Sequence, residues 1–278
     1  MRPVPTRFSY VLERCSLVGH FCPNGLERIH CTMTPALNIE EVISGKASGL
    51  DAASLRKTYL DQDEFLGLDD FLPAEVMEQW SAQLEFLKPH IHRNFIPRHK
   101  KGGSVGYDTV SASARAMNAV YQSPALLALL KKITGAEMQE CPESDPHRCA
   151  LYAYTEEGDH IGWHYDTSSY KDRRWTLLVG FQDNSSSRLV CKLHTKNPGH
   201  EAVSLSLEVA PGTLVLFNGD KVYHAVTPTR AGETRFMVSM QYVTNASMNP
   251  FMRFVSNMKD SIAYFGLKEV FFGRRKSA

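Results

Sequence analysis

The stretch "GDHIGWHYDTSSY", residues 158–170, places a histidine and an aspartate two positions apart, His164 and Asp166. On an extended strand, residues i and i+2 point to the same side, so both side chains would project into one pocket. Imidazole and carboxylate groups held side by side are ligands for a transition metal. A histidine–aspartate pair alone is weak evidence for a metal, because polar pairs are common at strand ends.

His224 is the candidate for the third ligand. It follows "PGTLVLFNGDKVY", which predicts a strand, a turn and a second strand that would bring His224 beside the pair. Two imidazoles and one carboxylate on one face of iron(II) leave other positions open for reactants. Arg235 comes shortly after, in "GETRFMVSMQYV". A guanidinium inside a barrel needs an anion, and its planar fork matches a carboxylate.

The order and spacing of these four residues resemble the iron(II)- and 2-oxoglutarate-dependent dioxygenases over about residues 140–245. Tyr154 and Gly158 are similar to the family's prolyl-hydroxylase-like branch, and the resemblance implies a cofactor-binding role for Tyr154. It also implies that the triad binds Fe(II), that 2-oxoglutarate chelates the iron, that Arg235 holds the far carboxylate of 2-oxoglutarate, and that O2 is consumed. One departure concerns Ser239. It lies four positions after the arginine, where the family has a serine two positions after it.

Residues 145–186 look like the lysine halogenases and their hydroxylase relatives, which act on free amino acids. Halogenating members replace the carboxylate ligand with a small residue and so open a position for chloride. Because this chain has Asp166 there, the resemblance implies a hydroxylase of an unactivated C–H bond, with lysine or another basic amino acid as the first candidate substrate. Desaturation and cyclisation by the same site stay open.

Four further residues are candidates for substrate binding. Counting by twos from His164 places His160 on the same inward face. Arg98 precedes a glycine-rich segment, predicted to be a turn, and could bind an α-carboxylate, while Glu143 or Asp145 could meet a side-chain ammonium. Each has a simpler interpretation. His160 would be a hydrogen-bonded histidine, and Arg98 would be part of a solvated basic loop. Glu143 and Asp145 would be turn residues beside prolines.

Two alternatives to a free-amino-acid hydroxylase remain. The same site could hydroxylate a peptide or protein side chain or a secondary metabolite, for which an open groove would be expected instead of a compact pocket. A jelly roll can also be a metal-stabilised binding module or a sensor, although such a module has no need to bury Arg235 opposite the metal. Fold analogy alone does not decide between them.

Bulk composition narrows the partners. The 278 residues carry 31 basic and 30 acidic side chains, for a net charge of +1, so neither nucleic acid nor a membrane surface is an expected partner. A small-molecule substrate is expected, and a homodimer is one oligomeric state left open. The six cysteines form no close pair, which is typical of free thiols in a reducing compartment and favours a cytoplasmic location.

The pattern along the chain predicts which elements position the site. Residues 36–135 are helical in pattern, with one helix after Pro73 and another between Ser123 and Gly135. After residue 148 eight short strands follow: "CALYAYT", "HIGWHYD", "WTLLVGF", "RLVCKLHT", "AVSLSLEV", "GTLVLFNG", "YHAVTPT" and "TRFMVSMQYV".

These elements predict an α+β fold with a double-stranded β-helix core, jelly-roll or cupin-like, and N-terminal packing helices. An extension of unknown role would span residues 1–32, and a single domain would span residues 33–278. That domain would contain the helical support, the jelly-roll core and a C-terminal helix over residues 249–266.

Overall fold

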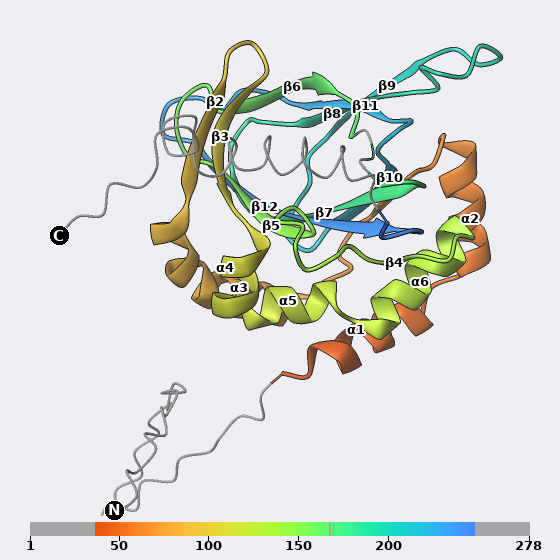
Figure 1. Cartoon of the computed structure of the whole chain (residues 1–278), viewed down its shortest axis with the longest axis horizontal. Helices are drawn as coiled ribbons and strands as arrows, with labels where there is room; N and C mark the ends of the chain where they lie inside the picture. Colours follow the sequence, from red (N-terminus) through yellow and green to blue (C-terminus); the bar gives the residue numbers. More distant parts are fainter. Residues whose placement is uncertain (1–36, 167, 169, 248–278) are drawn as a thin grey trace, which may run out of the picture. The chain divides into compact units, whose positions relative to one another are not determined.

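The computed structural model describes residues 37–166, 168 and 170–247, and one compact unit begins at Asn38. The expected extension and the expected C-terminal helix lie outside the described residues. Among those described, twelve strands form one antiparallel sheet that curls until its two halves face each other (Figure 1). The predicted α+β fold with a double-stranded β-helix core is confirmed.

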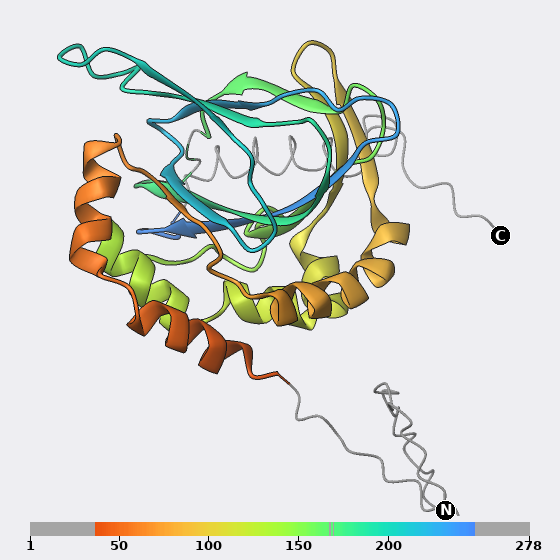
Figure 2. The ribbon, with the colours of Figure 1, turned by 180° about the vertical axis from the view of Figure 1, so that it is seen from behind.

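The helices lie along one side of this curled sheet, as both views show (Figures 1 and 2). Two predicted helix signals are confirmed. Pro73 immediately precedes α3, and the Ser123 hydroxyl accepts the Leu126 N–H at 3.1 Å while Gly135, at φ +68°, ends α6. The helices are α1 (Ile39–Ser48), α2 (Ala52–Asp61), α3 (Ala74–Leu87), η1 (Lys88–His90), α4 (Tyr107–Ser113), α5 (Arg115–Tyr121) and α6 (Pro124–Thr134).

All eight predicted strands are present as β5 to β12, but the structure adds four strands within the part expected to be helical or connecting. The strands are β1 (Phe65–Leu68), β2 (His92–Ile96), β3 (Lys100–Val105), β4 (Gln139–Glu140), β5 (Cys149–Tyr154), β6 (His160–His164), β7 (Arg174–Asn184), β8 (Leu189–Leu193), β9 (Val203–Leu207), β10 (Leu214–Asn218), β11 (Tyr223–Val226) and β12 (Thr234–Val243).

The strand order explains how the halves face each other. One half runs β1-β10-β7-β12-β5, the other runs β6-β11-β8-β9, and β3 joins them by pairing with both β5 and β6. The helices cover the first half. Trp80 of α3 packs edge-on against Phe181 of β7, with the ring centres 5.5 Å apart. The Tyr121 hydroxyl of α5 donates to the Gln241 carbonyl of β12. Nearly every residue of β12 is therefore buried on both faces.

The space between the two halves is lined by apolar side chains. Burial of each such side chain contributes roughly 1.5–3 kcal/mol to folding. The buried members of the interior cluster are Phe65, Tyr154, Leu189, Cys191, Leu193, Val209, Val215, Phe217, Val222, Val226 and Met237.

Of the six cysteines, the structure describes three, and all three are buried free thiols. No helix in the described part of the chain is long and apolar enough to cross a membrane.

Gly180 in β7 provides a test of how tightly this half of the sheet is packed. A Cβ there would overlap the carbonyl oxygens of Val209 and Ala210. We expect Gly180→Ala to lower the free energy of unfolding by roughly 1–3 kcal/mol, because backbone atoms on both sides must shift. Urea denaturation measures this. Gly67→Ala is the control, since no atom lies within 4 Å of its added Cβ. Equal urea denaturation midpoints for the two variants would contradict the tight packing around Gly180.

Candidate metal centre

The predicted triad meets at the end of β6 and the start of β11. His164 and His224 are directly opposite each other in the antiparallel pair of these strands. Asp166 lies between them, with Oδ1 at 3.3 Å from His164 Nε2 and Oδ2 at 3.8 Å from His224 Nε2. One ligand atom from each residue lies within 4.8 Å of the other two. The structure therefore brings His224 beside the pair His164 and Asp166, from which it is distant in sequence.

Backbone contacts orient both imidazoles for a metal. Nδ1 of His164 lies 2.8 Å from the Gly162 carbonyl oxygen, and Nδ1 of His224 lies 3.1 Å from the Val222 carbonyl oxygen. A carbonyl oxygen only accepts hydrogen bonds, so each Nδ1 must carry the proton. Each Nε2 is then free to offer its lone pair, which is the form in which histidine binds metals.

The electrostatics of the triad favour an ionised carboxylate. Burial alone would raise the pKa of Asp166, but the two neighbouring imidazoles outweigh it and hold that pKa far below its usual value. Burial lowers the pKa of His224. Burial also acts to lower the pKa of His164, but the hydrogen bond and charge of Asp166 raise it above its ordinary value. A divalent cation held by the three side chains would neutralise the charge of this carboxylate.

A β-bulge in β6 sets the direction of His164. Between the pairs His164–His224 and Ile161–Val226, β6 has two residues where β11 has one. The extra residue shifts the alternation of the strand, so Ile161 and His164 both face the interior. Gly162 is one of the two bulge residues, and a Cβ there would lie only 3.2 Å from a carbonyl oxygen of the β2–β3 hairpin.

Because of this bulge, the prediction that His160 faces inward is wrong. His160 is the cross-strand partner of Lys101, whose side chain points outward and donates to the Glu157 carbonyl. The Nδ1 of His160 lies 2.7 Å from the Gly158 carbonyl oxygen. Counting by twos from the metal ligand fails when an unseen residue is inserted into the strand.

The other substrate-binding candidates do not converge on the triad. Arg98 is exposed in the turn between β2 and β3, at φ +63°, and the glycines predicted to form a turn after it lie inside β3. Glu143 is exposed. Asp145 is buried, and its carboxylate accepts the Tyr170 hydroxyl at 2.6 Å and the His147 N–H at 2.8 Å. The Asp145 carboxylate, which was expected to meet a substrate ammonium, therefore already accepts hydrogen bonds from the protein.

Arg235 is fully buried in β12 and offers an anion site. Its Nη1 donates to the Ser187 hydroxyl at 3.2 Å, and its Nε lies 3.4 Å from Asp183 Oδ2. Its Nη2 has no hydrogen-bond partner among the described residues. Tyr154 of β5 is its cross-strand partner, so both side chains share a face. A buried guanidinium with unmet N–H groups is costly unless a carboxylate arrives to accept them.

Polar side chains on β7 and β12 support the triad, and sequence reasoning missed them. Thr176 donates to Asp166 Oδ2 at 2.6 Å, which fixes the carboxylate from behind. The side-chain oxygen of Gln241 accepts from Arg174 Nε at 2.5 Å. The amide of Gln241 donates to the Ser239 hydroxyl at 3.3 Å, so Ser239 contacts this group instead of Arg235. No spacing rule points to these residues, because only the sheet register brings them together.

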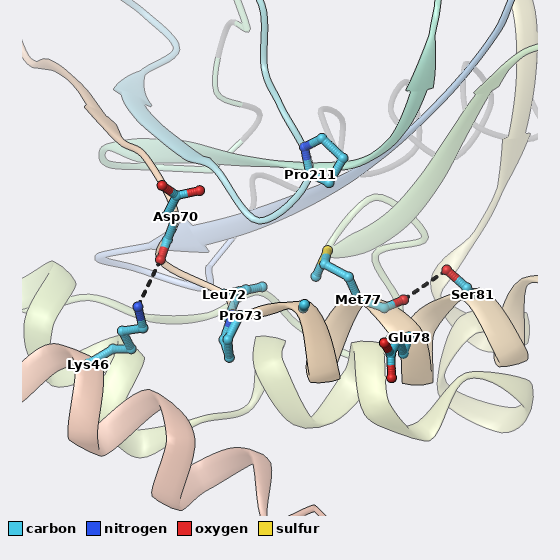
Figure 3. Close-up of a pocket in the computed structure, with 9 residues that line it drawn as sticks. Lys46, Asp70, Leu72, Pro73, Met77, Glu78, Ser81 and Pro211 are labelled. Carbon is cyan, nitrogen blue, oxygen red and sulfur yellow. Dashed lines mark hydrogen bonds between the residues drawn. The ribbon is translucent and has the colours of Figure 1, made fainter.

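A separate hollow of about 510 Å³ lies at the start of α3 (Figure 3). There the Lys46 ammonium donates to the Asp70 carbonyl at 3.1 Å. None of the triad residues belongs to this hollow, and it is not the metal site. It is lined by Lys46, Asp70, Leu72, Pro73, Ala74, Met77, Glu78, Ser81 and Pro211.

Two family models match this chain. The model of the 2OG-Fe(II) oxygenase superfamily matches residues 149–242, from β5 to β12, a span that contains the triad and Arg235. The segment from β5 to β12 is thus identified as that of a 2OG-Fe(II) oxygenase. A second model, described as Halogenase D, matches residues 50–171 and so includes the first two triad residues. No curated protein matches the sequence of this oxygenase.

Solved structures share the fold of this oxygenase. A prolyl hydroxylase from Trichoplax adhaerens, in complex with a peptide fragment of hypoxia inducible factor, aligns with a TM-score of 0.57 and 13% identity over 77% of this chain and 95% of that chain. The epimerase SnoN, in complex with Fe3+, alpha ketoglutarate and nogalamycin RO, aligns with a TM-score of 0.56 and 13% identity over 69% of this chain and 84% of that chain. HygX from Streptomyces hygroscopicus, with nickel and 2-oxoglutarate bound, aligns with a TM-score of 0.51 and 14% identity over 67% of this chain and 85% of that chain.

Iron(II), 2-oxoglutarate and O2 are therefore the cofactor and cosubstrates of this oxygenase. When bound, they supply an oxidant strong enough to break a C–H bond while 2-oxoglutarate is decarboxylated to succinate. The donor set fits the metal, because two neutral imidazoles and one carboxylate are the ligands that non-haem iron takes. The interpretation as a non-catalytic binding module is thereby removed.

Gly219 is expected to be essential to the position of Asp166. A Cβ on Gly219 would lie 2.5 Å from the Cβ of Asp166 and 2.8 Å from its carbonyl oxygen. We expect Gly219→Ala to push the carboxylate away and weaken iron(II) binding by about tenfold or more, measured by anaerobic titration. Gly45→Ala in α1 is the control, as its added Cβ meets no atom within 4 Å. Unchanged iron affinity in Gly219→Ala would show that Asp166 is not a ligand.

Thr176→Val tests the support of the carboxylate without a change of shape. The variant removes the hydroxyl that donates to Asp166 Oδ2, and we expect iron(II) affinity to fall by about 10- to 100-fold. Thr134→Val removes another buried hydroxyl, which bonds the Leu130 carbonyl of α6. It should leave iron affinity unchanged in the same titration. Equal iron affinities for the two variants would argue against the proposed role.

Proposed function

We propose that this oxygenase hydroxylates an unactivated C–H bond of a free amino acid, with lysine or another basic amino acid as the first candidate. The Halogenase D match over residues 50–171 supports the proposal, because this part of the chain also resembles the lysine halogenases and their hydroxylase relatives. Asp166 is the observation that carries the choice of reaction. It supplies a third protein ligand within the matched segment, and a carboxylate there fills the position that chloride would need.

In this proposal the triad holds the iron and Arg235 holds the far carboxylate of 2-oxoglutarate. The contact of Nε with Asp183 and of Nη1 with Ser187 leaves Nη2 to meet the cosubstrate. The apolar interior between the two halves of the sheet keeps water away from the reacting atoms. The share of the protein is thus to fix ligands, orient the cosubstrate and exclude water.

A peptide is the second candidate substrate, and one feature favours it. Phe95 and Ile96, at the end of β2, expose 70% and 42% of their surfaces. The hairpin that carries them also carries His99, whose ring lies 5.6 Å from that of His164. An apolar rim beside the metal site could hold an extended chain.

The buried free thiols support our further proposal of a reducing, cytoplasmic location.

Succinate formation tests the substrate class. The protein is loaded anaerobically with iron(II), and succinate release from 2-oxoglutarate in air is measured with each of the common amino acids in turn. We expect lysine or arginine to raise succinate several-fold and to yield a product about 16 mass units heavier, the mass of one added oxygen.

His224→Ala is the matched control for this assay and should abolish both signals. Low, uniform turnover with every amino acid, together with intact iron and 2-oxoglutarate binding, would sink the free-amino-acid proposal. Peptides from a library would then be assayed next. Loss of iron binding in the unaltered protein would overturn the proposed site itself.

A further inference from the structure

Lys100 lies on the inward face of β3, the strand that joins the two halves of the sheet (Figure 1). Its cross-strand partner is Ile161 of β6, which packs against the interior cluster. The next residue, Lys101, points the opposite way and donates to the Glu157 carbonyl outside. The Lys100 ammonium lies 4.8 Å from the centre of the Tyr152 ring. The side chain therefore enters the space where the reaction is expected.

The charge of this lysine acts on the metal site. It acts to lower the pKa values of both His164 and His99, whose rings lie 5.6 Å apart, so its charge reaches the triad. No described carboxylate lies within ion-pair distance of Lys100. Burial without such a partner lowers the pKa of Lys100 to about 8. Lys100 is half-buried, and an ammonium that faces an apolar interior without a carboxylate partner is stabilised when an anion joins it.

A count of charges in the loaded site indicates what that anion is. Iron(II), Arg235 and Arg174 would bring four positive charges, whereas Asp166, Asp183, Asp145 and the two carboxylates of 2-oxoglutarate would bring five negative charges. One negative charge would then stay uncompensated among apolar walls, which is unfavourable. The ammonium of Lys100 makes the loaded site neutral.

We propose that Lys100 is a second carboxylate-binding residue of the active site, which acts from β3 while Arg235 acts from β12. The shared chemistry is a carboxylate close to the metal. It belongs either to the metal-chelating end of 2-oxoglutarate, which the charge count favours, or to the amino-acid substrate. The inference rests on the proposed ligand set and on the proposed anion site at Arg235.

Lys100→Met removes the charge and keeps the length of the side chain. Binding of 2-oxoglutarate to protein loaded with iron(II) is measured by anaerobic calorimetry. If 2-oxoglutarate supplies the carboxylate, its affinity should fall about 10- to 100-fold, as expected for the loss of one charge-assisted hydrogen bond. Lys101→Met is the matched control on the opposite face of the same strand and should stay within about twofold of the unaltered protein.

Two further arms complete the test. Lys100→Arg keeps a positive charge and should recover most of the affinity, and Lys100→Gln serves if the methionine variant does not fold. If the substrate supplies the carboxylate, 2-oxoglutarate affinity is unchanged, but the KM for the compound that stimulates succinate release rises by a similar factor. Unchanged affinity for 2-oxoglutarate together with an unchanged KM overturns the inference.

Iron(II) affinity separates this inference from the proposed function. Lys100 is not a ligand, so Lys100→Met should bind iron(II) as the unaltered protein does. Failure of the proposed site would instead appear as absent iron(II) binding in the unaltered protein. The two failures therefore give different results in the same titration.

Discussion

The antiparallel pairing of β6 with β11 is the contact on which the whole site depends. It places His164 directly opposite His224, and Asp166 follows where β6 ends. Because side chains alternate along a strand, a register slip of one residue would turn a ligand out of the interior. The bulge before His164 and the backbone carbonyls that hold both imidazoles fix this register and these ring orientations together. The metal site is thus built by the sheet before any metal arrives.

The apolar interior makes each buried charge depend on a partner. Asp166 is held by Thr176 and by two imidazoles, and Arg235 is held by Asp183 of β7 and by Ser187 in the connection that follows it. Such contacts fix the charged groups before reactants bind, which lowers the reorganisation that the reaction requires. The longest strand, β7, carries both Thr176 and Asp183 and so supports the carboxylate and the guanidinium from one element.

The sequence was sufficient to predict the eight core strands, the meeting of His164, Asp166 and His224, and the burial of Arg235, because each depends on alternation along a strand. It was insufficient for features that depend on non-local register. The bulge in β6 is invisible to a count by twos, so His160 was misplaced. Gly102 and Gly103 appeared to form a turn, but both lie in β3, where Gly103 makes room for the Ile91 side chain. Thr176 carries no signal until β7 is placed.

The place of β3 indicates how cofactor chemistry and substrate choice are divided along the chain. Residues 149–242, matched by the superfamily model, contain the triad and Arg235, to which the proposal assigns the iron and the far carboxylate of 2-oxoglutarate. The β2–β3 hairpin lies outside that span and inside the Halogenase D match, yet it brings His99 and Lys100 to the same metal site. Because β3 closes the gap between β5 and β6, its inward face becomes a wall of the pocket. Substitutions there would change what the site binds and leave the iron ligands in place.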